Sequence, residues 1–222
     1  GFVKVAAATP DIRVADVAYN VEQIKKQMDE ADEQGAKVVV FPELCLTGYT
    51  CGDLFGQEIL LKAVKEGLRE LTEYTKEKDG LYFVGAPAEV EGKLYNVAAV
   101  IYGGKILGFV PKSYLPNYSE FYEARQFVEA PAENGEHLWK EGESVPFGAN
   151  LIFTHKKYHR FSFGIELCED LWTPIPPSGE LAMAGAHIIL NLSASDELTG
   201  KAGYRRELVK NQSARTLSAY LY

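Results

Sequence analysis

The chain has 222 residues, of which 46% are hydrophobic and 24% are charged, values that are typical of one large globular domain. A formal net charge of −8, without any stripe of Lys and Arg, argues against a nucleic-acid-binding surface. No apolar run approaches the length of a membrane span, and three cysteines without a disulfide framework favour a reducing compartment, so we expect a cytoplasmic protein.

The first part of the chain alternates between strand and helix patterns. Residues 2–8 are rich in β-forming residues, and residues 38–41 are continuously apolar, as in a strand buried on both faces. Helices are predicted over residues 16–35 and 58–78, because apolar residues recur there every three or four positions. The two apolar faces consist of Val17, Val21, Ile24, Met28 and Ala31, and of Leu61, Val64, Leu68 and Leu71.

The rest of the chain adds hairpins and a polar stretch. Gly103-Gly104 is a strong two-residue turn signal between strands over residues 95–102 and 105–110. Residues 117–143 are polar and irregular, which predicts a long loop region with some helix. Further strands are predicted at residues 81–86, 151–154, 161–167, 187–192 and 218–222, with a helix beginning at Lys201. Helices between some strands and hairpins between others indicate an α/β fold with a mixed sheet covered by helices, in one domain over residues 1–222.

Three short segments each place one reactive side chain directly after a predicted strand. They are FPELCLTGY around Glu43, VPKSYLPNY around Lys112 and IELCEDLW around Cys168. A thiol needs a base to become a nucleophile, and the tetrahedral intermediate of acyl transfer needs a cation or N–H donors for its oxyanion. We therefore predict that Cys168 is a nucleophile, Glu43 its general base and Lys112 the cation.

Each of these residues taken alone also has a purely structural interpretation. A buried cysteine is commonly a small apolar residue, Glu43 can be a solvated strand terminus, and Lys112 can be an exposed lysine. Cys45 and Cys51 follow strands less closely, and we interpret them as structural. No Gly-x-Ser-x-Gly elbow supports a serine hydrolase, and the four histidines form no convincing set, so we expect no catalytic metal.

The three segments together resemble the nitrilase superfamily of carbon–nitrogen hydrolases, which share a Glu-Lys-Cys triad. The order Glu, Lys, Cys is kept, with separations of about 70 and about 55 residues. The resemblance spans essentially the whole chain and implies a four-layer α-β-β-α sandwich with mixed sheets. The final strands of that sandwich have no counterpart, so we expect a domain that is truncated at its C-terminus.

Two longer segments resemble one branch of the superfamily, the glutaminase domain of glutamine-dependent NAD synthetases. They are KSYLPNYSEFYEAR at residues 112–125 and LSASDELTGKAGYRRELVKNQSAR at residues 192–215. The resemblance implies glutamine hydrolysis, homo-oligomers and the passage of ammonia to a separate C-terminal synthetase domain. That domain would use ATP, Mg and deamido-NAD and is expected to be absent here, because no Ser-Gly-Gly-type phosphate loop occurs; the glutaminase part itself needs no cofactor.

The resemblance also implies roles for residues outside the triad. Glu120 lies where the superfamily has a second glutamate that helps to position the lysine and the substrate. A glutamine zwitterion needs an acid for its ammonium group and donors for its carboxylate. Tyrosine and phenylalanine residues often pack in cores and loops instead of binding a ligand. Each assignment of a residue to the glutamine pocket therefore depends on its geometry. The residues that match the family's glutamine pocket are Tyr49, Tyr118, Phe121, Glu169, Ser195 and Lys201.

Three functional interpretations remain open from the sequence. The first is hydrolysis of glutamine through a Cys168 thioester, in which Glu43 acts as base, then acid, then base. Lys112 and the backbone N–H after Cys168 would stabilise the oxyanion. The second is a free-standing amidase of the superfamily, such as an ω-amidase or carbamoylase, and the third is a non-catalytic binding or assembly module.

Overall fold

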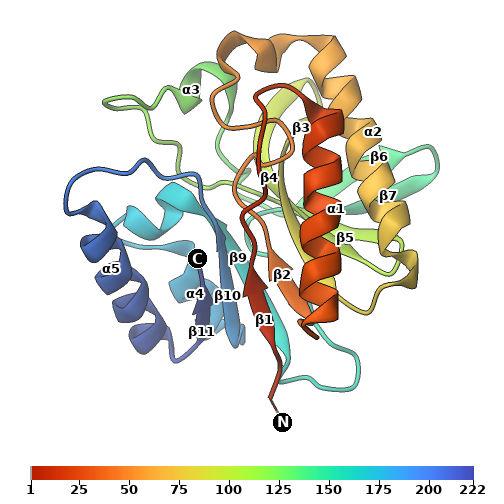
Figure 1. The fold of residues 1–222 in the computed structure, drawn as a ribbon. Coiled ribbons are helices and arrows are strands. Elements are labelled where there is room, and N and C mark those ends of the chain that lie inside the picture. Colours follow the sequence, from red (N-terminus) through yellow and green to blue (C-terminus); the bar gives the residue numbers. More distant parts are fainter. Residues whose placement is uncertain (1) are drawn as a thin grey trace.

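Two mixed β-sheets lie face to face, and helices cover the outer face of each (Figure 1). The computed structural model describes residues 2–222. Helices α1 (Val17–Glu33) and α2 (Glu58–Tyr74) cover the larger sheet, and α4 (Pro177–Met183) and α5 (Lys201–Thr216) cover the smaller one. The order helix, sheet, sheet, helix confirms the predicted α-β-β-α class.

The larger sheet contains seven strands in the order β1-β2-β3-β4-β5-β7-β6, and the smaller contains four in the order β11-β10-β9-β8. Parallel and antiparallel neighbours occur in both sheets. The strands of the larger sheet are β1 (Val5–Ala7), β2 (Val38–Val40), β3 (Leu81–Val90), β4 (Lys93–Tyr102), β5 (Lys105–Pro111), β6 (Gly135–Lys140) and β7 (Glu143–Phe147). Those of the smaller sheet are β8 (Ile152–Thr154), β9 (Ser162–Leu167), β10 (Ile188–Leu192) and β11 (Ala219–Leu221). Short helical turns are η1 (Gly52–Gly56), η2 (Thr75–Glu77), α3 (Glu123–Gln126) and η3 (Cys168–Trp172).

The two long N-terminal helices follow the predicted apolar periodicity. The carboxylate of Asp16 caps α1 by accepting a hydrogen bond from the backbone N–H of Tyr19 at 3.1 Å. All five apolar residues predicted for α1 are buried. In α2 the buried face begins at Leu60 and not at Leu61, and the helix ends at Tyr74 before the turn η2, somewhat earlier than predicted.

The hairpins were predicted less completely than the helices. Gly103 and Gly104 both have positive φ, as the turn between β4 and β5 requires. A second such turn at Glu91 and Gly92 joins β3 to β4, so both strands are longer than predicted. The prediction of irregular chain over residues 117–143 is wrong in part, because β6 lies within that range and pairs with β7 in a hairpin. Most side chains of β6 are exposed, so its sequence lacks the apolar alternation that identifies a strand.

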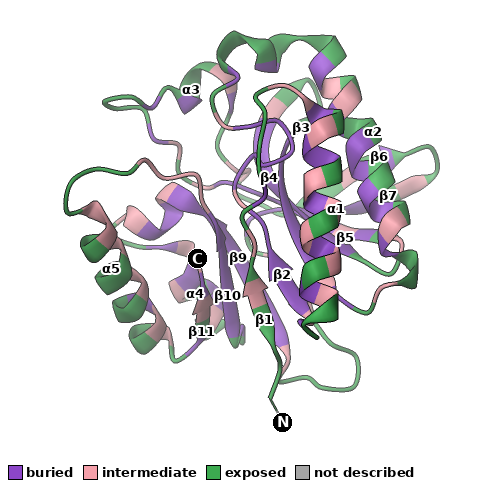
Figure 2. Ribbon diagram, viewed as in Figure 1, coloured by how far each residue is buried: buried purple, intermediate pink, exposed green. Residues whose placement is uncertain are grey.

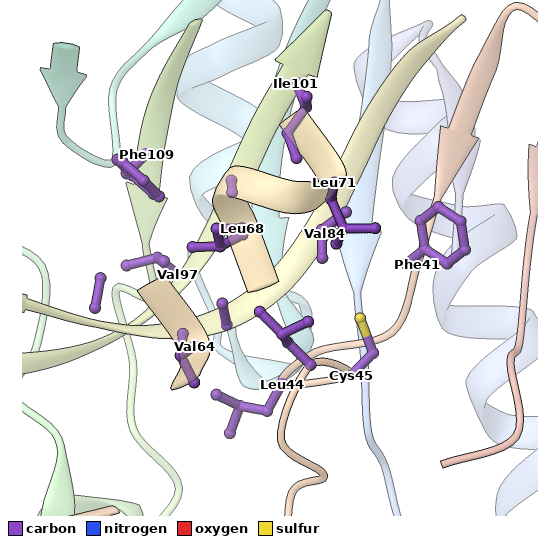
Figure 3. Close-up of a cluster of buried hydrophobic side chains, with 14 of the residues drawn as sticks. Phe41, Leu44, Cys45, Val64, Leu68, Leu71, Val84, Val97, Ile101 and Phe109 are labelled. Atoms are coloured by element: carbon purple, nitrogen blue, oxygen red, sulfur yellow. The ribbon is translucent and has the colours of Figure 1, made fainter. Parts of the chain in front are cut away.

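Buried side chains form three clusters, one between each pair of neighbouring layers. Figure 2 shows buried residues along the strands of both sheets and at positions on helices α1 and α2. The largest cluster packs α1 and α2 against the large sheet, and Figure 3 shows Val64, Leu68 and Leu71 of α2 within it. A second cluster, which includes Phe83 and Leu190, fills the space between the sheets. No helix among residues 2–222 combines the length and the apolar character needed to cross a membrane.

Candidate active site

The carboxyl ends of strands from both sheets supply the candidate catalytic residues. Glu43 lies beyond β2 and Lys112 directly follows β5, and these two strands run in the same direction in the larger sheet. Cys168 directly follows β9 of the smaller sheet, and Ser193 directly follows its parallel neighbour β10. The seam between the sheets therefore collects residues that are far apart in sequence.

Glu43 and Lys112 form a buried ion pair. The Lys112 Nζ lies 2.6 Å from the Glu43 Oε1, and both side chains are fully shielded from solvent. Asn96 on β4 donates a further hydrogen bond to the Glu43 Oε1 at 2.7 Å. Burial opposes the charge on Lys112, but the negative charges of Glu43 and Glu123, and of Cys168 when it is ionised, prevail and raise its pKa. Lys112 is thus a fixed cation.

Glu123, and not Glu120, is the second glutamate at Lys112. The Lys112 Nζ lies 2.6 Å from the Glu123 Oε1, and Tyr49 donates to the same oxygen at 2.6 Å. Glu120 is exposed, and the hydrogen-bond and ion-pair partners of Lys112 are Glu43 and Glu123, so the position of Glu120 does not support its predicted role. The helical turn α3 begins at Glu123 and directs that carboxylate inward. The sequence offered two glutamates three residues apart and no means of choosing between them.

Cys168 is buried, and its backbone has a left-handed φ of +41°. Its backbone N–H donates to the Asn191 Oδ1 at 2.9 Å, and the Ser193 hydroxyl donates to its Sγ at 3.3 Å. Burial raises the pKa of the thiol to about 12, helped by the charge of Glu43 and opposed by Lys112 and Ser193. At neutral pH the sulfur is therefore protonated, and a nearby base is needed to activate it.

Glu43 is placed to act as that base. The backbone N–H of Ala194 donates to the Glu43 Oε2 at 3.1 Å and also interacts with the Cys168 sulfur. One N–H group therefore faces both the carboxylate and the thiol. The arrangement puts a carboxylate beside a thiol and an ammonium group near both, and these are the types of group that acyl transfer uses.

The other two cysteines occupy different surroundings. Cys45 lies in the hydrophobic cluster beside Phe41 and Leu44, and its sulfur contacts the Gly85 carbonyl at 3.6 Å (Figure 3). The Cys51 sulfur contacts the Thr47 carbonyl at 3.2 Å. All three cysteines are free. Among residues 2–222, no charged side chain contributes to the pKa shifts of the Cys45 and Cys51 thiols, whereas the charges of Glu43 and Lys112 both act on Cys168.

Most of the predicted pocket residues lie close together. The Tyr118 hydroxyl donates to both Glu169 oxygens at 3.1 and 3.0 Å. Phe121 packs edge-on against Tyr49 and Tyr118, with ring centroids 6.2 and 5.7 Å apart. The Lys201 Nζ lies 5.9 Å from the centre of the Phe121 ring. These contacts join the loops after β5, β9 and β10 around one aromatic cluster.

Ser195 and Lys201, which are predicted to bind the carboxylate of glutamine, both interact with Asp196. Lys201 forms an ion pair with Asp196, and the Ser195 hydroxyl lies 3.5 Å from the Asp196 carbonyl oxygen. Lys201 also lies 5.1 Å from the centre of the Trp172 ring. Asp196 and Trp172 therefore lie beside the predicted pocket residue Lys201, and neither was recognised from the sequence.

Other residues at the site were also missed from the sequence. Asp170 is buried and accepts hydrogen bonds from the backbone N–H groups of Leu167, Ser113 and Tyr114, so it ties the loop after Lys112 to the end of β9. Burial raises its pKa to about 8, although the N–H donors favour the charged form. Asp170 was visible only as part of a polar turn after Cys168. Among residues 2–222, no group of three or more His, Cys, Asp and Glu side chains is arranged to hold a metal ion.

Comparison with known families identifies the family of this chain. Residues 4–219 match the model of the family described as carbon-nitrogen hydrolase. The chain belongs to the carbon–nitrogen hydrolase family. This membership confirms the predicted superfamily, and the family model covers the segments around Glu43, Lys112 and Cys168.

Curated relatives with similar sequences include glutamine-dependent NAD(+) synthetases. The glutamine-dependent NAD(+) synthetase of Mycobacterium bovis is 41% identical over 222 residues, which is 100% of this chain and 32% of that protein. The glutamine-dependent NAD(+) synthetase of Aquifex aeolicus is 33% identical over 94% of this chain and 33% of its own length. The chain thus spans about a third of the length of the curated relatives it matches.

Solved structures of related proteins share the fold. The glutamine-dependent NAD(+) synthetase of Cytophaga hutchinsonii superposes with a TM-score of 0.88 at 28% identity, over 99% of this chain and 35% of that one. An amidase from Nesterenkonia sp. superposes with a TM-score of 0.78 at 17% identity, over 99% of this chain and 75% of the amidase. The amidase supports the fold alone, whereas the synthetases agree in both sequence and fold.

Proposed function

We propose that this carbon–nitrogen hydrolase domain hydrolyses the side-chain amide of glutamine and supplies the ammonia to an NAD synthetase domain. The observation that carries the proposal is the buried pair of Glu43 and Lys112 beside Cys168, in a chain 41% identical to a glutamine-dependent NAD(+) synthetase. ATP, Mg and deamido-NAD would serve the synthetase domain, and no step proposed here uses them. The homo-oligomeric state and the cytoplasmic location stay predictions.

Acylation begins with the amide carbon of glutamine above the sulfur of Cys168. Glu43 takes the thiol proton, and the thiolate forms a C–S bond to the amide carbon, giving a tetrahedral oxyanion. Lys112 uses two of its three N–H donors on Glu43 and Glu123, so its third donor is available to this oxyanion. Protonated Glu43 passes its proton to the leaving nitrogen, the C–N bond breaks, and ammonia departs.

Deacylation uses the same carboxylate. Glu43 removes a proton from water, and the resulting hydroxide attacks the thioester carbonyl carbon. The C–S bond breaks, glutamate leaves, and the sulfur recovers a proton from Glu43. One carboxylate can act in both directions because the Ala194 N–H holds the Glu43 Oε2 beside the sulfur.

Substrate binding in this proposal uses the aromatic cluster around Phe121. Glu169 would accept the α-ammonium group of glutamine beside Tyr118, and Ser195 and Lys201 would donate to the α-carboxylate. Lys201 must share its ammonium group with Asp196 to do so. Glu123 takes over the supporting role that sequence alone assigned to Glu120, because its contact with Lys112 supports that role.

The proposal is tested with a diazo-ketone analogue of glutamine, which alkylates a nucleophilic thiol in a glutamine site. We expect one adduct on Cys168, located by peptide mass mapping and suppressed by glutamine. Cys168→Ala should give no adduct and no ammonia while keeping its circular dichroism spectrum, since the substitution removes only one small side-chain atom. Normal ammonia release by folded Cys168→Ala would disprove the proposed nucleophile.

A panel of amides separates glutamine hydrolysis from a general amidase activity. We expect glutamine to be hydrolysed in preference to short aliphatic amides, since Glu169 and Lys201 match the two charges of its α-carbon. An adduct on Cys168 combined with preference for an uncharged amide would reject the glutaminase proposal in favour of an amidase. A stable glutamine complex without adduct or ammonia would favour a binding module.

A further inference from the structure

Two hydroxyl groups connect the end of the last strand to the sulfur of Cys168. The Ser193 Oγ lies 3.3 Å from the Cys168 Sγ and 2.7 Å from the Tyr222 Oη. Ser193 directly follows β10 and Tyr222 directly follows β11, and these strands are parallel neighbours in the smaller sheet. Their carboxyl ends therefore lie together, and the sulfur, serine and tyrosine form a chain of three polar atoms.

The number of hydrogens on each group determines which atom donates in these two hydrogen bonds. A serine hydroxyl has one hydrogen, so Ser193 can donate either to the sulfur or to Tyr222 at one time. When the sulfur is a thiolate it can only accept, so Ser193 donates to it and Tyr222 donates to the Ser193 oxygen. The side chain of Trp172 also hydrogen-bonds the Tyr222 hydroxyl, and an indole is only a donor, so the phenol hydrogen is left for Ser193.

We propose that Ser193 and Tyr222 form a hydroxyl relay that positions and stabilises the Cys168 thiolate from the smaller sheet. The inference rests on the proposed role of Cys168 as the nucleophile, and it adds two positioning residues to that site. Lys112 and Glu43 approach the sulfur from the larger sheet, so the relay supplies a hydrogen-bond donor from the opposite sheet. The Tyr222 phenol keeps its hydrogen at neutral pH, because burial raises its pKa to about 12.

The charged and titratable groups around the sulfur show why a neutral donor is useful. Glu43 disfavours the thiolate, and Lys112, which favours it, spends two donors on carboxylates. Tyr49 and Tyr118 also lie close enough for their pKa values to depend on the charge of Cys168. A hydrogen bond from Ser193 stabilises the thiolate without adding a further charge to this crowded cluster.

Tyr220, two residues before Tyr222, holds a different atom of the same cysteine. Its hydroxyl donates to the buried carboxylate of Glu166 and accepts from the Asn191 amide at 3.1 Å. Asn191 in turn accepts the backbone N–H of Cys168 at 2.9 Å. Tyr220 therefore supports the backbone of the nucleophile, whereas Tyr222 reaches the sulfur, and the two tyrosines can be compared by the same substitution.

The test measures the rate at which iodoacetamide alkylates Cys168 at one pH below the thiol pKa, by peptide mass mapping. Below that pKa the rate follows the thiolate fraction, so a pKa rise of one unit slows alkylation ten-fold. We expect Ser193→Ala to be about ten-fold slower than the parent, as for loss of a hydrogen bond to a charged atom. Tyr222→Phe should be about two-fold slower, since it removes only the polarising second bond.

Two further variants separate the relay from other effects. The double variant Ser193→Ala with Tyr222→Phe should be no slower than Ser193→Ala alone, because Tyr222 acts only through Ser193. Tyr102→Phe, an exposed tyrosine on β4, should match the parent. Both relay substitutions remove an atom and so cannot narrow the access to the sulfur, which makes slower alkylation a sign of lost thiolate.

Unchanged or faster alkylation in folded Ser193→Ala would overturn the proposal. Additive slowing in the double variant would also overturn it, because Tyr222 would then act independently of Ser193. Circular dichroism and thermal melting of each variant identify those that are folded, and Tyr220→Phe shows the effect of disturbing β11 without removing the relay. The assay contains no glutamine, so its outcome is separate from that of the glutaminase proposal.

Discussion

Cys168 has the backbone conformation of a residue under strain. Its φ of +41° lies in the left-handed region, which costs a non-glycine residue on the order of 1–3 kcal/mol. Hydrogen bonds on both sides hold this conformation, from the Leu167 N–H to Asp170 and from the Cys168 N–H to Asn191. The turn thus directs the sulfur toward the seam between the sheets, where Glu43 and Lys112 lie.

The protonation state of Cys168 leads to a prediction with opposite effects on two reactions. The charge of Glu43 raises the pKa of the thiol, which stands at about 12, so Glu43→Gln lowers that pKa. We expect Glu43→Gln to lose amide hydrolysis, because no base or acid remains. Iodoacetamide should nevertheless alkylate its Cys168 about ten-fold faster at neutral pH, since the thiolate fraction rises.

The pH dependence of alkylation is the control for this prediction. In the parent protein, alkylation of Cys168 should accelerate about ten-fold for each pH unit from about pH 7 to about pH 9, because the pH in this range is far below the pKa of the thiol. Glu43→Gln should keep that slope with a higher rate at every pH. Slower alkylation of the folded variant would contradict this prediction. It would mean that Glu43 promotes thiolate formation by accepting the proton more than its negative charge opposes the thiolate.

Two nearby glutamates provide a matched test of the site geometry. Glu123→Gln removes the negative charge that lies 2.6 Å from the Lys112 Nζ, so kcat should fall about 10- to 100-fold, as for one lost charged hydrogen bond. Glu120→Gln should retain the parent kcat, because Glu120 is exposed and Lys112 forms its ion pairs with Glu43 and Glu123 instead. Steady-state ammonia release measures both variants, and the reverse ranking would restore the assignment made from sequence.

At the scale of the element, the turn after β2 carries Glu43 and packs directly against β3. The backbone N–H of Leu46 donates to the Gly85 carbonyl at 3.2 Å, and Leu44 has a φ of +51°. A Cβ at position 85 would lie 2.3 Å from the Pro42 carbonyl oxygen and 2.4 Å from the Leu44 nitrogen. Only a glycine lets the turn approach the strand this closely.

Gly85→Ala should therefore disturb both stability and catalysis. The added methyl group meets backbone atoms, which cannot rotate away, so we expect a loss of about 1–3 kcal/mol in the free energy of unfolding. Ammonia release should fall more than about ten-fold, because Glu43 moves with the turn. Denaturant unfolding and the glutaminase assay measure the two effects.

Gly179→Ala in α4 is the control for this substitution. A Cβ there meets no atom within 4 Å, and alanine favours a helix by about 0.5–1 kcal/mol relative to glycine. This variant should be as stable as the parent or slightly more stable, with unchanged activity. Equal stability and activity of the two alanine variants would show that the close approach of the turn to Gly85 is not required.

At the scale of the whole molecule, the site lies where two sheets from different parts of the chain meet. Side chains from both sheets form the cluster between them, with Phe83 from the larger sheet and Leu190 from the smaller. Asp170 adds polar bonds across the same seam, from the end of β9 to the loop after β5. The positions of Cys168 and Lys112 therefore depend on the packing of the sheets as a unit.

Leu190→Ala tests this dependence. Leu190 is fully buried between the sheets, so its truncation should cost about 2–5 kcal/mol and lower the melting temperature by roughly 5–15 °C. Leu138→Ala on the exposed face of β6 should change the stability by less than about 0.5 kcal/mol. Scanning calorimetry and activity after heating should follow one transition. Loss of activity well below the unfolding of the sheets would contradict the shared packing.

The sequence by itself determined the elements whose signals are local. The buried stripe of α1, the Gly103-Gly104 turn and the strand before Cys168 were all visible, because side-chain periodicity and turn chemistry act over a few residues. The family was also readable from the segments around Glu43, Lys112 and Cys168. The hairpin of β6 and β7 was not readable, because β6 is mostly exposed and lacks an apolar alternation.

Only the tertiary structure decided which polar residues meet. Glu123 and Glu120 are equivalent by residue type and nearly so by position, and only the turn at α3 brings one of them to Lys112. Ser193 and Tyr222 reach the sulfur of Cys168 because β9, β10 and β11 are parallel neighbours. A hydrogen bond depends on distances of about 3 Å between atoms, and residues far apart in sequence acquire such distances only when the sheets pack.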